Sequence, residues 1–108
     1  MQICFRIQNI DPGCVLKSYI ERRLRFALGR FGERVAEVAV RMSGNAKENE
    51  CRISTELRPF GRVAVREVDP DLFVAIDRAT GRVGRLFGRE LQRVRDLRRN
   101  QESVRMAA

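Results

Sequence analysis

Five arginines recur at helical spacing in the second half of the chain, where their guanidinium groups could bind a phosphate-bearing partner. They are Arg78, Arg82, Arg85, Arg89 and Arg93, separated by four, three, four and four residues. At about 100° per residue, the five side chains fall within roughly 80° of arc along roughly 22 Å of helix. Because arginine can bind a phosphate through two hydrogen bonds, this arginine row fits a polyanion with repeating phosphates. A solvated helix face in an arginine-rich chain would show the same spacing.

The apolar residues of this segment lie on another face of the expected helix. They are centred about 120° from the arginine row. They are Leu72, Ile76, Ala79, Val83, Leu86, Phe87, Val94 and Leu97. One face can therefore pack on a core while the neighbouring face stays available to a ligand.

The composition of the whole chain also favours an anionic partner. Its 108 residues carry a formal net charge of +8, with 22 lysines and arginines against 14 aspartates and glutamates. Such a balance points to nucleic acid or another anionic surface. With 44% hydrophobic and 33% charged residues, the chain is typical of one folded domain with a modest core.

The sequence lacks the usual catalytic and metal-binding patterns. It has no histidine, and its three cysteines, Cys4, Cys14 and Cys51, form no CxxC pair. We therefore expect no enzyme activity, no metal and no cofactor. No apolar run approaches the about 18 residues of a membrane helix, and no signal peptide opens the chain. The expectation is a cytoplasmic protein with no membrane partner and no small-molecule substrate.

Hydrophobic periodicity predicts an α+β fold with the element order β-α-β-β-β-α. Strands are expected over 2–8, 35–43, 51–58 and 62–66, and helices over about 12–30 and 70–98. Asp11-Pro12 and Asp69-Pro70 would start the two helices, while Gly29 and Gly32 would help to end the first. We expect one domain over residues 1–98, followed by a flexible C-terminal tail over 99–108.

Each expected strand has one apolar face, so both helices should cover the same face of a four-stranded sheet. This arrangement is like that of double-stranded-RNA-binding domains. The first helix should connect parallel strands through a right-handed crossover. The core expected beneath the helices contains Ile3, Phe5, Val38, Val40, Ile53, Leu57, Val63 and Val65, with Ala36 and Met42 on the same side of the second strand.

The opposite face of the sheet should carry charges of alternating sign and no aromatic ring. That composition is typical of a solvated face with cross-strand ion pairs. It also lacks the aromatic side chains on which RNA-recognition motifs stack bases. Any nucleic-acid binding is therefore expected on the helical side.

The first helix adds basic residues to that side, namely Arg22, Arg23, Arg25 and Arg30. Two basic helices packed side by side would form one broad cationic surface. Such a surface would recognise phosphates by shape rather than bases by their edges, which suits structured RNA.

Three glycines, Gly81, Gly84 and Gly88, share one side of the second helix beside the arginine row. Each costs about 1 kcal/mol relative to alanine within a helix. Their bare backbone would allow close approach of the first helix, a second copy of the chain or an RNA backbone. A well-packed helix could also simply tolerate them.

Three stretches within residues 1–95 follow the order of a known family. They are "MQICFRIQNI", "YIERRLRFALGRFGERVAEVAVRMS" and "DPDLFVAIDRATGRVGRLFGRE". In this order they resemble the opening strand, basic helix with outer strand, and closing helix of the ribosome hibernation promoting factors, also called ribosome-associated inhibitors or sigma-54 modulation proteins. The resemblance implies binding to ribosomal RNA in the decoding region of the small subunit, with inhibition of translation under stress.

The same resemblance assigns RNA binding to basic positions of both helices. Arg82, Arg85 and Arg89 match the closing pattern, and Arg22, Arg23 and Arg25 are the nearest equivalents on the first helix. With Arg78 and Arg93 they complete the expected RNA-binding set. Because no long C-terminal extension follows, we expect the family's short form, without its dimerising domain.

The chain also departs from the family pattern. Arginine and glycine replace a lysine-rich helix, and the first helix is about one residue longer between Leu24 and Phe31. These departures leave an alternative open: a protein–protein or self-associating regulatory module, derived from this family, without ribosome binding. Its partner would be a regulator or a second copy in a homodimer. A general RNA chaperone is a third hypothesis.

Overall fold

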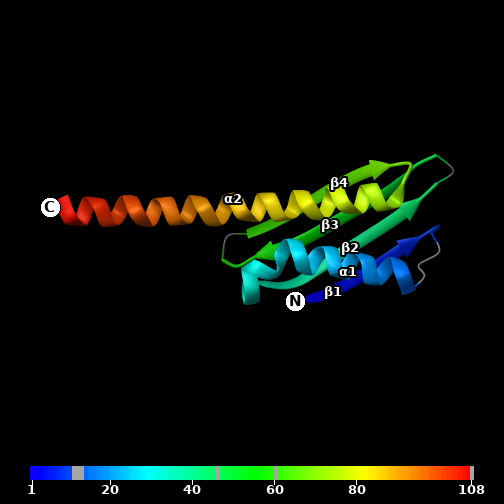
Figure 1. The fold of residues 1–108 in the computed structure, drawn as a ribbon, viewed down its shortest axis with the longest axis horizontal. Coiled ribbons are helices and arrows are strands. Elements are labelled where there is room, and N and C mark those ends of the chain that lie inside the picture. The colour runs from blue at the N-terminus through cyan, green and yellow to red at the C-terminus, as the bar shows by residue number, and fades with distance from the viewer. Residues whose placement is uncertain (11–13, 46, 60, 108) are drawn as a thin grey trace.

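Four strands form one sheet, and two helices lie side by side on one of its faces (Figure 1). The structure is a computed structural model that describes residues 1–10, 14–45, 47–59 and 61–107. The strands are β1 (Gln2–Gln8), β2 (Val35–Gly44), β3 (Asn49–Leu57) and β4 (Gly61–Asp69). The helices are α1 (Cys14–Leu28), the short 3₁₀ helix η1 (Gly29–Arg34) and α2 (Leu72–Ala107). The predicted α+β class and element order are confirmed.

The sheet has the strand order β1-β2-β3-β4. β1 runs parallel to β2, while β3 runs antiparallel to both of its neighbours, β2 and β4. The parallel pair confirms the expected β1-α1-β2 crossover, because parallel neighbours need a connection that returns across the sheet. The handedness of that crossover and the likeness to double-stranded-RNA-binding domains remain predictions.

The core lies between the sheet and the two helices, as expected. Val38, Val40, Ile53, Leu57 and Val65 are buried, whereas Ile3, Phe5 and Val63 on the outer strands are only partly buried. The helices contribute further buried residues, including Ile20, Leu24, Leu28, Ile76, Val83 and Phe87. Complete burial of such a side chain contributes about 1.5–3 kcal/mol.

The prediction that Ala36 faces the core is wrong. Ala36 is exposed, while both Val35 and Val38 are buried. The pairing of β2 with β3 shifts register between Val35 and Val38, which interrupts strict alternation at this point.

The first helix is shorter than the sequence suggests. It ends at Leu28 rather than near residue 30, and η1 follows with Gly32 at a φ of 58°. Glycine adopts this left-handed conformation without the steric penalty of a side chain. Asp11-Pro12, the expected helix start, lies outside the described residues.

The second helix begins at Leu72, two residues later than expected from Asp69-Pro70. Its cap is Asp71, whose Oδ1 accepts a hydrogen bond of 2.9 Å from the Phe73 N–H. Asp69 instead accepts a hydrogen bond of 2.8 Å from the Asp71 N–H. Asp69 therefore positions the capping residue and is not itself the cap.

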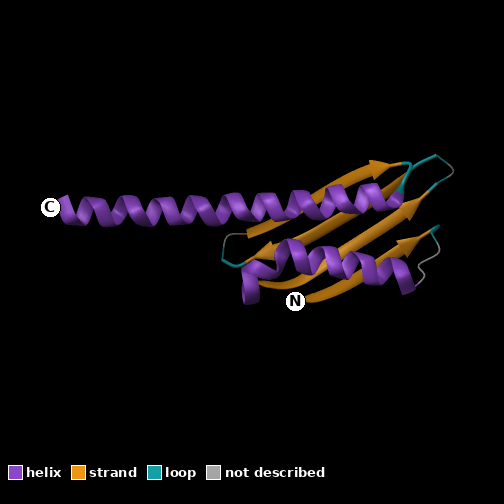
Figure 2. Cartoon of the chain, viewed as in Figure 1, coloured by secondary structure: helices purple, strands orange, loops and turns teal. Residues whose placement is uncertain are grey.

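The second helix also runs past residue 98 to Ala107 and projects beyond the sheet (Figure 2). No glycine or proline follows Gly88 to interrupt it, and the Gln92 amide donates a 3.2 Å hydrogen bond to Asp96. The periodicity placed Val94 and Leu97 on the apolar face of the helix. Neither side chain belongs to the core, and Leu97 is 53% exposed. The flexibility of residues 99–108 remains a prediction.

Candidate nucleic-acid interface

The arginine row lies on the solvent side of α2. All five side chains are exposed, with exposed fractions of 58% for Arg78, 53% for Arg82 and 73% for Arg93. The buried residues of the same turns, such as Ala79 and Val83, face the sheet. The row is therefore positioned by the packing of the opposite helix face, as the sequence predicted.

The arginines of the row differ in what neutralises them. Arg78 Nη1 lies 3.2 Å from Asp69 Oδ2, and Arg82 Nη1 lies 3.4 Å from Glu67 Oε1, both on β4. Arg85 and Arg89 have no acidic partner among the described residues. Positive charge on α2 is therefore most available at Arg85 and Arg89.

The three predicted arginines of α1 do not share one environment. Arg22 and Arg25 are exposed, but Arg23 is turned towards α2. Its Nε lies 3.2 Å from Asp77 Oδ1 without hydrogen-bond geometry. Arg23 therefore links the two helices, whereas Arg22 and Arg25 present their charges to solvent.

Asp77 anchors a small polar cluster between the helices. It accepts a hydrogen bond from the Tyr19 hydroxyl, which raises the pKa of that hydroxyl. The Tyr19 ring also packs edge-to-face on Phe73, with 5.0 Å between ring centroids. These contacts fix α1 relative to the arginine row.

Close approach of the helices explains two of the three glycines. A Cβ at Gly84 would lie 3.3 Å from both the Cβ and the carbonyl oxygen of Ala27 on α1. A Cβ at Gly88 would lie 2.5 Å from Arg30 Nη2. At Gly81 it would meet only Arg85 Nη1 of the same helix, at 3.3 Å. The neighbour at Gly84 is therefore α1, and the neighbour at Gly88 is the Arg30 side chain of η1.

Arg30 was expected among the basic residues of the first helix but not in the RNA-binding set, and it lies where η1 meets α2. Its Nη2 donates a 3.4 Å hydrogen bond to the Gly84 carbonyl oxygen. Its guanidinium carbon lies 4.8 Å from the centroid of the Phe31 ring. The glycine at position 88, one turn beyond Gly84, was the available sequence signal, because it leaves room for a long side chain from a neighbouring element.

The basic surface continues along the projecting part of α2. Arg93, Arg95 and Arg99 are exposed there, and Arg93 lies 4.0 Å from Glu90. A partner could therefore contact both the domain and the helix that extends from it.

Metal-binding clusters and membrane-spanning helices are both missing from the described part of the chain. No group of three or more histidine, cysteine, aspartate or glutamate side chains is arranged there to hold a metal ion. Among the described helices, none combines the length and the apolar character needed to cross a membrane.

Comparison with known proteins places the chain in a family. Residues 3–95 match the family model described as sigma 54 modulation protein / S30EA ribosomal protein. The chain belongs to this family. The predicted resemblance is thereby confirmed, and the family is one of ribosome-associated hibernation factors.

Two solved structures resemble the chain closely in fold. The N-terminal domain of Protein Y from Thermus thermophilus is 31% identical, with a TM-score of 0.72, and the match covers 82% of this chain and 98% of that one. A ribosomal subunit interface protein from Coxiella burnetii has a TM-score of 0.72 at 14% identity, over 85% and 99% of the two chains. The second likeness supports the fold alone. No significant match was found among curated proteins.

Proposed function

We propose that this protein binds ribosomal RNA in the decoding region of the small subunit and inhibits translation under stress, without catalysing a reaction. The observation that carries the proposal is the exposed arginine row on α2 of a chain in a ribosome-associated family. Its action would be steric, since a folded domain held in the decoding region would exclude other ligands. A cytoplasmic location follows from binding to ribosomes.

Arginine–phosphate contacts would supply most of the binding free energy. Arg85 and Arg89 are exposed and have no acidic partner within the described part of the chain. Each phosphate neutralised by such a group releases condensed counterions, so affinity falls as salt concentration rises. Bidentate hydrogen bonds would orient the RNA backbone on the helix.

The paired arginines would join the interface by exchanging partners. The Arg78–Asp69 and Arg82–Glu67 pairs are exposed, and exposed ion pairs are generally worth less than about 1 kcal/mol. An RNA phosphate can therefore replace either carboxylate at a cost of no more than about 1 kcal/mol. Until it does, each pair holds its guanidinium near β4.

The first helix would contribute direct contacts and one positioning residue. Arg22 and Arg25 are exposed and available to phosphates. Arg23, bound between the helices at Asp77, would instead keep α1 and α2 at the spacing that the RNA requires. Arg93 would extend the contact along α2.

Sucrose-gradient sedimentation with purified small ribosomal subunits tests the proposal. The protein should migrate with the small subunit at low salt, and the bound fraction should fall steeply as salt is raised. Absence from the small-subunit fraction at low salt would contradict the proposal.

The alternative function, a self-associating module without ribosome binding, is favoured by one observation. Two apolar side chains on α1 are strongly exposed, Phe26 at 85% and Val15 at 75%. Sedimentation velocity over a range of protein concentrations tests it. A dimer that Phe26→Ser converts to monomer, together with no ribosome binding, would favour this alternative.

A further inference from the structure

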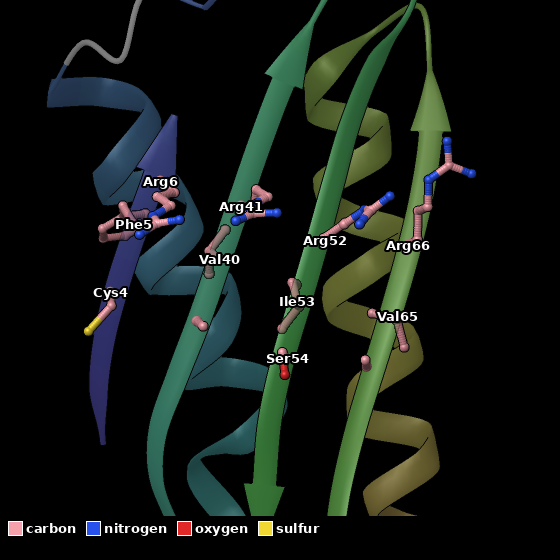
Figure 3. A pocket seen from close by; sticks show the side chains of 12 residues that line it. Cys4, Phe5, Arg6, Val40, Arg41, Arg52, Ile53, Ser54, Val65 and Arg66 are labelled. Atoms are coloured by element: carbon pink, nitrogen blue, oxygen red, sulfur yellow. The ribbon is translucent and has the colours of Figure 1, made fainter. Parts of the chain in front are cut away.

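Four arginines form a row across the face of the sheet opposite the helices. The strand registers pair Arg6 with Arg41, Arg41 with Arg52, and Arg52 with Arg66. One guanidinium therefore comes from each strand, as Figure 3 shows. With neighbouring strands about 4.8 Å apart, the row spans about 14 Å. The expected alternation of sign fails along this row, because the spacing of charges within each strand does not determine which residues pair across strands.

Only two of the four arginines in this row across the sheet have an acidic partner among the described residues. Glu50 pairs with both Arg52 and Arg66, and its Oε2 lies 3.1 Å from Arg66 Nη2. Those two arginines, Arg66 first, lower the pKa of the Glu50 carboxyl. Arg6 and Arg41 have no acidic partner among the described residues. Like charges directly opposite each other destabilise a sheet, so a bound anion would relieve this repulsion.

Small side chains line the sheet immediately beside the arginines. The next row along the strands consists of Cys4, Ala39, Ser54 and Ala64, which pair in that order. Together with the arginines they line a hollow of about 650 Å³. That volume is within the range of about 300–1,000 Å³ typical of small-ligand sites. The hollow exists because none of these four residues has a large side chain.

The far side of the small-residue floor carries charges of both signs. A second hollow, of about 220 Å³, shares Ala39 and Ser54 with the first and is lined also by Glu37, Glu56, Arg58 and Arg62. Glu37 Oε1 accepts a 3.4 Å hydrogen bond from Cys4 Sγ, so the carboxylate leans towards the floor. The two hollows therefore share one floor and form a trough, with the arginine row along one side and the Glu37 carboxylate on the other side of Ala39.

We propose that this trough binds a nucleoside polyphosphate. Its phosphates would lie on Arg6 and Arg41, its base on the floor at Ala39, and the N–H groups of the base would donate to Glu37. A guanine base suits this arrangement, because its two neighbouring N–H groups match the two oxygens of one carboxylate.

The trough fits other anions less well. Inorganic polyphosphate would contact the arginines but leave the floor and Glu37 without a role. An acidic peptide would bring further carboxylates towards Glu37, which would repel them. The sheet lies between this trough and the two helices, so the proposal is independent of ribosome binding (Figure 3).

Isothermal titration calorimetry with GTP and with inorganic tripolyphosphate tests the proposal on the full chain. GTP should bind at one site per chain, and tripolyphosphate about tenfold or more weakly. The double variant Arg6→Gln, Arg41→Gln should weaken GTP binding by about tenfold or more, since it removes two charge-assisted contacts. The matched control Arg85→Gln, Arg89→Gln on α2 should leave GTP binding unchanged.

Two single variants separate the roles of base and floor. Glu37→Gln should weaken GTP binding without weakening tripolyphosphate binding. Ala39→Leu keeps every charge but fills the floor, and it should abolish GTP binding while circular dichroism remains that of the parent. Ala39 is exposed, so this variant should fold.

Several results would overturn the proposal. They are the absence of saturable GTP binding, equal affinity for GTP and tripolyphosphate, and unchanged GTP binding in the Arg6/Arg41 or Ala39→Leu variant. A short single-stranded RNA that binds the trough more tightly than GTP would assign the face to a macromolecule instead. None of these results bears on sedimentation with the small subunit, so the two proposals fail separately.

Discussion

Neighbouring arginines on α2 differ in how much of their charge is free for a new partner. Arg85 has no acidic partner within the described residues, whereas Arg78 lies 3.2 Å from Asp69. A phosphate that binds Arg78 must displace a carboxylate, which offsets part of the gain in free energy.

We therefore expect Arg85→Gln to weaken small-subunit binding more than Arg78→Gln. Loss of one phosphate contact should reduce the slope of log affinity against log salt by about 0.7–0.9 for Arg85→Gln, and by less for Arg78→Gln. Affinity measured at several salt concentrations provides the slopes. Equal reductions would show that the β4 carboxylates do not compete with RNA.

The described cysteines should differ in reactivity, because the thiolate is the reacting species. Cys51 is buried, and burial raises its pKa to about 12. Cys4 is exposed, and its hydrogen bond to Glu37 raises its thiol pKa.

At about pH 8, below the usual thiol pKa of about 8.5, a thiol reagent should modify Cys4 but spare Cys51 in the folded protein. Glu37→Gln should lower the Cys4 pKa and accelerate its modification at the same pH. Mass spectrometry of peptides resolves each cysteine. A slower reaction of Cys4 in the variant would contradict the Glu37 contact.

The packing of α1 on α2 depends on individual glycines. Gly84 faces Ala27, whose Cβ and backbone oxygen would both lie 3.3 Å from an added methyl group. Gly81 faces only the end of the Arg85 side chain, which can move. Helix propensity favours alanine at both positions, so any difference between them reports helix–helix contact.

Gly81→Ala should stabilise the protein by up to about 1 kcal/mol. Gly84→Ala should be less stable than Gly81→Ala by about 1–3 kcal/mol, because overpacking opposes the gain in propensity. Urea unfolding monitored by circular dichroism measures both. Equal stabilisation by the two substitutions would show that α1 can move away from the added methyl group at Ala27 without a cost in stability.

Strand faces were predictable from the sequence because alternation of apolar and polar residues reports burial directly. In β3, Cys51, Ile53 and Leu57 are buried as expected. Cross-strand register was not predictable, so neither the exposure of Ala36 nor the alignment of Arg6, Arg41, Arg52 and Arg66 could be anticipated.

The arginine row on α2 was predictable, because helical periodicity determines which residues share a face. The environment of each arginine was not predictable, since the Arg23–Asp77 and Arg82–Glu67 pairs depend on how α2 packs against α1 and β4. The C-terminal end of α2 was also predicted too early. Its fully buried side chains end at Phe87 among the described residues, well before the helix ends at Ala107.

The whole molecule is elongated by the projecting end of α2. Its longest extent is 64 Å, against 24 and 18 Å in the other directions. Phe87 is the last fully buried side chain of α2 among the described residues. The domain core therefore does not depend on the projecting segment, although exposed Arg99 lies there.

A chain ending at Asp96 should consequently unfold at nearly the same urea concentration as the full protein. It should nevertheless bind the small subunit less tightly at moderate salt, because basic residues have been removed. Unfolding and binding measured on the same sample distinguish the two effects. A large loss of stability would show that the projecting helix supports the core.

Co-sedimentation with the small ribosomal subunit shows whether the arginine row on α2 holds the protein there. The triple variant Arg82→Glu, Arg85→Glu, Arg89→Glu should no longer migrate with the small subunit, while circular dichroism shows an intact fold because these side chains are exposed. The matched control Arg41→Glu, Arg52→Glu, on the opposite face of the sheet, should bind nearly as the parent does. Release of the control but not of the triple variant would contradict the claim.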